Sequence, residues 1–227
     1  MAWSFRFSGN SGPTLESQKS TEKRIIDKMN TKKGWGSVSD MNTVCSHELP
    51  VKPLQQVVDL TNPLYQSLQG KYFIGQTPTL FVGNGSNAWA ALCNPPDSHR
   101  NLFFNVFTIS NFSSSVISAK LWLNAVLSGD SASSSFISPT NTALTPKTDH
   151  KVQLRYVQST GETPSGGVNI FGRIVPPYTT LASEEDGKII IPPGGNVLLF
   201  LTSSSPETIN AIVAFGWWET REEYSIS

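Results

Sequence analysis

The chain has 227 residues, of which 38% are hydrophobic and only 15% are charged, and 17 basic side chains balance 17 acidic ones. This length fits one large domain or a domain with an appendage, and the apolar content is enough for a packed core. Balanced charge excludes a general attraction to nucleic acid, and no run approaches the ~18 apolar residues of a membrane span, so neither partner is expected.

The first residues lack the basic start and apolar segment of a secretory signal. We therefore expect synthesis in the cytoplasm, with lysis releasing the protein into an extracellular or particle-associated assembly. The two cysteines, Cys45 and Cys93, are too few for a disulfide scaffold and wrongly spaced for a zinc site. Two interpretations stay open for them: free thiols, or one bridge that could join two chains.

Residues 1–69 differ in character from the rest and are predicted to form an extended N-terminal arm. A charged segment at 16–33 carries a short apolar stripe, which predicts a short amphipathic helix. Prolines then break the chain into extended pieces. Apolar residues would anchor this arm to its own domain or to a neighbouring subunit, namely Val57, Val58, Leu60, Leu64 and Tyr65.

From residue 70 to residue 227, short β-branched and aromatic runs alternate with turns. The clearest period of two covers 117–127, which predicts one strand with one buried face. The acidic stretch 184–187 is predicted to be a turn between two strands, and Pro-Pro-Gly-Gly at 192–195 must be another. Roughly ten short strands at this spacing predict an all-β fold, an antiparallel two-sheet sandwich with jelly-roll topology as the natural outcome.

Several strands are apolar on both faces, most clearly at 101–111 and 209–218. An isolated sandwich needs only one buried face per strand. The second faces must therefore be covered by the arm, by loops or by another subunit.

Catalysis has little support in the sequence. The histidines, His47, His99 and His150, all lie in loop-like segments, and Asp97-Ser98-His99 reads as a polar turn because a triad needs three-dimensional roles. We expect no enzyme activity, no cofactor and no metal.

Tryptophans are the candidate ligand or interface residues: Trp122, Trp217 and Trp218. Because neighbours in a strand alternate in direction, at least one of Trp217 and Trp218 must point away from the core. Such a ring could stack on a glycan, or it could pack at a subunit contact.

The run Ile189–Phe200, which contains the Pro-Pro-Gly-Gly turn, and the run Ile209–Trp218 follow an N-terminal extension that carries Cys45. Together they resemble small jelly-roll subunits of spore-forming bacteria, including the endospore-appendage fibre proteins. The resemblance implies an N-terminal connector that docks on a neighbouring subunit and is cross-linked by cysteines. This chain differs in having a longer extension and a single cysteine within it.

These observations predict a non-enzymatic structural protein that assembles with copies of itself into a fibre, lattice or shell. The contacts would be made by the N-terminal arm and the apolar sheet faces. Two alternatives stay open: a lectin-like or adhesin module that binds a glycan through exposed tryptophans, and a phage or viral capsid or tail protein.

Overall fold

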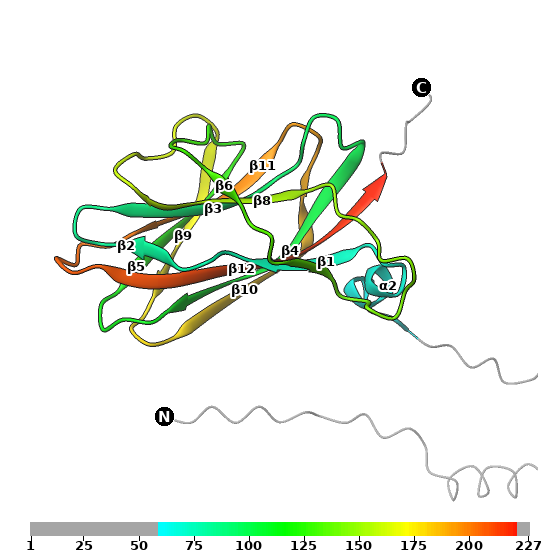
Figure 1. The fold of residues 1–227 in the computed structure, drawn as a ribbon, viewed down its shortest axis with the longest axis horizontal. Coiled ribbons are helices and arrows are strands. Elements are labelled where there is room, and N and C mark those ends of the chain that lie inside the picture. Colours follow the sequence, from blue (N-terminus) through cyan, green and yellow to red (C-terminus); the bar gives the residue numbers. More distant parts are fainter. Residues whose placement is uncertain (1–58, 222–227) are drawn as a thin grey trace, which may run out of the picture. The chain divides into compact units, whose positions relative to one another are not determined.

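The computed structural model describes residues 59–221 (Figure 1). The predicted helix at 16–33, Cys45, Val57 and Val58 lie outside this range. The elements are α2 (Asn62–Leu68), β1 (Tyr72–Gln76), β2 (Leu80–Val82), β3 (Asn87–Cys93), β4 (Arg100–Asn111), β5 (Ile117–Leu123), β6 (Ala132–Ser133), β7 (Ile137–Pro139), β8 (Gln153–Thr160), β9 (Val168–Val175), β10 (Thr180–Ile191), β11 (Asn196–Thr202) and β12 (Ile209–Arg221).

The strands form two antiparallel six-stranded sheets that pack face to face as two layers (Figure 1). The first sheet has the order β10-β4-β12-β1-β7, with β2 also paired to β12, and the second has the order β6-β8-β3-β11-β5-β9. Within them, the sets β10-β4-β12-β1 and β3-β11-β5-β9 have the strand order of an eight-stranded jelly roll. The predicted all-β sandwich is therefore confirmed.

The main core lies between the two sheets. Strand alternation turns Phe215 and Trp217 inward from β12, where they meet Phe73 from β1 and Phe104 from β4. Burying a side chain of this size stabilises the fold by about 1.5–3 kcal/mol relative to leaving it exposed. The core accounts for one apolar face of each long strand.

A loop covers part of the outer face of the second sheet, over β3, β8 and β11. The predicted strand at 117–127 ends early, at Leu123, because Asn124 adopts a positive φ of 53° and turns the chain. The loop then crosses the outer face, where the Trp89 indole N–H donates to the Ser128 carbonyl at 3.0 Å. It completes a second apolar cluster made of Trp89, Ala91, Ala125, Val157, Leu198 and Phe200.

The predicted acidic turn at 184–187 is wrong. Residues 180–191 form the single strand β10, whose register against β4 shifts between Glu184 and Ile189. The extra residues form a bulge, which interrupts a ladder without ending it. Gly187 has a φ of 70° there, and a Cβ on it would lie 1.9 Å from Cη2 of Trp218. Only glycine lets the bulge approach the indole this closely.

Helix α2 occupies a segment where the sequence analysis expected extended chain. Pro63 stands in its first turn, a position where the missing N–H of proline costs nothing, so the residue starts the helix and does not break it. The predicted anchors Leu60, Leu64 and Tyr65 are each about half exposed, so the described residues do not bury them. Within residues 59–221, no helix has the length and apolar character needed to span a bilayer.

Candidate functional site

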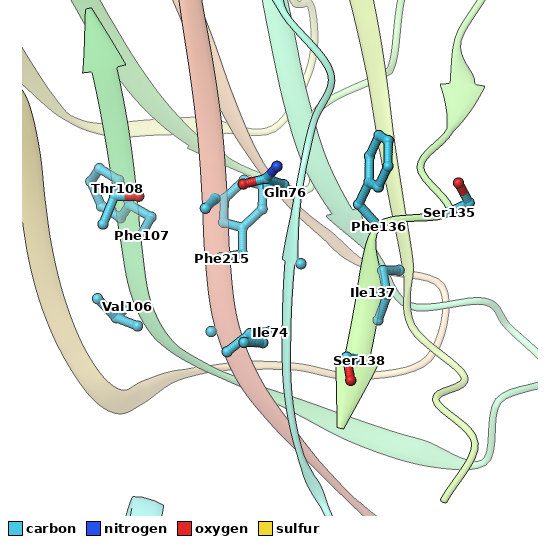
Figure 2. A pocket seen from close by; sticks show the side chains of 13 residues that line it. Ile74, Gln76, Val106, Phe107, Thr108, Ser135, Phe136, Ile137, Ser138 and Phe215 are labelled. Atoms are coloured by element: carbon cyan, nitrogen blue, oxygen red, sulfur yellow. The ribbon is translucent and has the colours of Figure 1, made fainter. Parts of the chain in front are cut away.

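An apolar groove crosses the outer face of the first sheet, with a volume of about 530 Å³ (Figure 2). Its floor is β12, where Ala214 and Gly216 present almost no side chain. Ile74 on β1, Val106 on β4 and Phe136 beside β7 border it. Four strands that are distant in sequence therefore contribute to one hollow.

At one point of the floor, a glycine lies between two β-branched residues. The register pairs Gly216 with Ile74 on one side and with Val106 on the other. A Cβ on Gly216 would lie 2.5 Å from the Tyr72 hydroxyl oxygen and 2.7 Å from Cγ1 of Val106. The surrounding side chains thus close over this position and leave the depression next to it.

An aromatic stack lies on the same sheet, outside the lining of the groove. The Tyr72 ring stacks on Trp218 with a centroid distance of 6.3 Å, and Trp218 stacks on Phe103 at 5.3 Å. Asn105 donates an amide hydrogen bond of 2.8 Å to the Tyr72 hydroxyl. Burial raises the pKa of Tyr72 above its usual value, although the bond from Asn105 lowers it, so the hydroxyl stays neutral.

The sides of the groove are exposed and uncharged. Ile74 is 50% exposed and Phe136 is 57% exposed. The lining contains no charged residue and consists of Ile74, Gly75, Gln76, Val106, Phe107, Thr108, Ser135, Phe136, Ile137, Ser138, Ala214, Phe215 and Gly216. Such a surface accepts apolar side chains and offers little to an ionic ligand.

The tryptophans do not form the exposed platform that the sequence analysis considered. Trp217 lies in the main core and Trp218, although on the outer face, is only 2% exposed. One ring of the pair, Trp218, does point away from the main core, but Tyr72, Phe103 and the β10 bulge cover it, so it offers no open face for a glycan. Trp122 is half-buried against the second apolar cluster.

Cys93 has a free thiol that is partly buried against the same cluster. Burial raises the pKa of the Cys93 thiol from 9.0 to about 11, opposed by the smaller effect of the Arg155 charge. A thiol in this state is a weak nucleophile at neutral pH. Its proposed partner, Cys45, lies outside the described residues, so a bridge between chains stays a prediction.

One acidic side chain is buried among the described residues, and the sequence analysis missed it. The Glu219 carboxylate is 1% exposed and accepts hydrogen bonds from the backbone N–H groups of Lys151, at 2.9 Å, and Val152, at 3.1 Å. The Trp217 indole N–H, at 3.2 Å, and the Arg100 guanidinium, at 3.4 Å, complete the set. The only sequence signal was an acid directly after the apolar run of β12.

These bonds give Glu219 a structural role. Its oxygens join the end of β12 to the segment that leads into β8, and no lone pair remains free for a substrate. A hollow of about 830 Å³ beside it is lined by exposed Lys71 and Arg221 and by half-buried Arg100. Glu219, the one buried acid beside this hollow, has no lone pair free for a ligand. The hollow is therefore a weaker candidate for a functional site than the apolar groove.

The remaining sequence candidates do not assemble into a catalytic or metal site. The Ser98 hydroxyl bonds to the backbone of Arg100, and His99 is exposed, so the Asp97-Ser98-His99 turn does not have the geometry of a triad. Between residues 59 and 221, no three His, Cys, Asp or Glu side chains come together as metal ligands.

The fold and the groove define a jelly-roll domain with an uncovered apolar surface. The chain belongs to DUF6143, a family of unknown function whose model matches residues 42–223. The match includes the entire described sandwich and also residues that precede it. No curated protein matches the chain.

Proposed function

We propose that this chain is a non-enzymatic structural subunit that assembles with copies of itself into a fibre, lattice or shell. One observation supports the proposal most: the outer faces of the two sheets are covered to different extents. A loop of the same chain covers the apolar outer face of the second sheet over β3, β8 and β11, whereas the groove on the first sheet stays open. An open, mostly apolar hollow of this volume is the default candidate for a binding or contact site.

The composition supports a contact between like copies. Charged residues make up 15% of the chain and basic and acidic side chains are equal in number, so copies do not repel one another strongly. In this proposal the N-terminal arm, residues 1–69, is the segment that reaches the neighbouring copy. The resemblance to endospore-appendage subunits supports a fibre as the form of the assembly.

The alternative of a lectin-like module has less support, because Trp217 and Trp218 are buried and Trp122 is half-buried. We also propose that the chain has no catalytic activity. Glu219, the one buried acid among the described residues, is fully used in holding the backbone.

Electron microscopy of the full chain tests the proposal, with one groove variant and one matched control. Ile74→Glu places a charge in the groove at a half-exposed position, and Ile174→Glu makes the same change at a 70% exposed isoleucine on β9 of the other sheet. Wild type and Ile174→Glu should form regular assemblies in negative stain, and Ile74→Glu should not. Dispersed single particles in the wild-type sample would refute the proposed function.

A further inference from the structure

Helix α2 presents a second apolar surface that the described chain does not cover. Leu64 and Leu68 are four residues apart and therefore adjacent on the helix, with Tyr65 beside them. Their side chains are 47%, 50% and 49% exposed, and no residue of the helix is buried. We call Leu64, Tyr65 and Leu68 the helix stripe.

Polar contacts hold the helix in place without using the stripe. The Ser67 and Thr140 hydroxyls are 2.8 Å apart, and the Asn141 side-chain amide donates to the Leu68 carbonyl at 3.5 Å. A helix of seven residues is too short to be stable alone, so these contacts fix it to the sandwich. The stripe is therefore a preformed apolar surface.

The helix stripe and the groove match in chemistry and in size. The helix sequence NPLYQSL has no charged residue, and the groove lining has none either. A cavity of about 150 Å³ accommodates one benzene ring, so a groove of about 530 Å³ has room for about three side chains of that kind. The helix stripe has three such apolar side chains.

We propose that the helix stripe of one copy docks into the groove of a second copy. This inference rests on the proposed function and names the two surfaces that make the contact. Within residues 59–221 both surfaces are uncovered, so the stripe does not occupy the groove of its own copy. The mode is an apolar helix face laid into a groove. Because the two surfaces differ, the contact is head-to-tail and builds rings or filaments.

Two single variants and their mixture test this arrangement. Leu64→Glu removes a functional stripe and keeps the groove, whereas Ile74→Glu removes the groove and keeps the stripe. Each buries an unpaired carboxylate at the contact, so each variant alone should associate at least about tenfold more weakly than wild type. Mixed in equal amounts, they should form a 1:1 complex and nothing larger, because one good stripe meets one good groove.

Sedimentation velocity gives the masses, and circular dichroism with urea unfolding checks that each variant is folded. Tyr65→Glu and Phe136→Glu, both at exposed positions, replace either variant that fails this check. Ile174→Glu should assemble like wild type. Variants that assemble like wild type, or a mixture that stays monomeric, would overturn the inference and leave the proposed function standing. A monomeric wild-type protein would overturn both.

Discussion

Replacing Glu219 by glutamine tests the structural role of this buried carboxylate. Glutamine has one acceptor oxygen, and its amide group would direct N–H donors at the N–H groups of Lys151 or at Arg100. Hydrogen bonds to a charged group contribute about 1.5–3 kcal/mol each. Loss of one or two of them lowers the free energy of unfolding by about 3 kcal/mol, which lowers Tm by about 6–12 °C for a chain of this size.

Urea unfolding and calorimetry measure this change, with Glu184→Gln as the control because Glu184 is exposed on β10. The control should stay within about 0.5 kcal/mol of wild type. Hydrogen exchange should show that the Lys151 and Val152 amides lose protection in Glu219→Gln only. A Glu219→Gln variant as stable as wild type would refute the structural assignment and reopen a functional one, since functional groups often reduce stability.

Three further predictions concern the coverings of the sheets and the free thiol. Gly187→Ala brings a Cβ into Trp218 and should lower the free energy of unfolding by about 1–3 kcal/mol, with a changed near-ultraviolet dichroism of the indole. Trp89→Phe loses the bond to the Ser128 carbonyl, so loop 124–131 should exchange its amide hydrogens faster, at a cost of about 0.5–1.5 kcal/mol. Folding raises the Cys93 pKa from 9.0 to about 11, so at pH 7.5 the thiolate fraction of the folded chain is about 100-fold lower than that of the urea-unfolded chain. The rate of Cys93 alkylation should be lower in the folded chain by the same factor. The folded-state rate should then climb with pH up to about 11, and site-resolved mass spectrometry showing equal folded and unfolded rates would contradict this.

Local features of the sequence were sufficient to predict the sandwich. The turn at 192–195 forms as expected, with Gly194 at a φ of 86° and the Gly195 N–H donating to the Pro192 carbonyl at 3.1 Å. Proline and glycine impose this geometry whatever surrounds them. The two-faced apolar pattern of β12 likewise predicted that its outer face would need a covering.

The predictions from sequence were wrong where contacts with residues distant in the sequence determine the local structure. Continuous alternation at 117–127 did not reveal the turn at Asn124, because the apolar residues beyond it pack on a different face of the same sheet. The acidic stretch in β10 resembles a turn, yet β10 pairs with β4 on both sides of it, which makes the stretch a bulge within one strand. Pro63 can break a helix or start one, and only the contacts of α2 with the sandwich settle which.

The groove could not be predicted from the sequence for the same reason. Ala214 and Gly216 are visible as small residues in an apolar run. What makes them a floor is the pairing of β12 with β1 and β4, which sets Ile74 and Val106 on either side. Register over such separations depends on the complete fold.

The self-association of the wild-type chain is the most direct test of this account. Sedimentation velocity of the full chain over a range of concentrations reports the mass of the particle relative to the 24.8 kDa monomer. The account predicts species heavier than the monomer whose share grows with concentration, because association by a surface contact follows mass action. A single 24.8 kDa species at every concentration would contradict it.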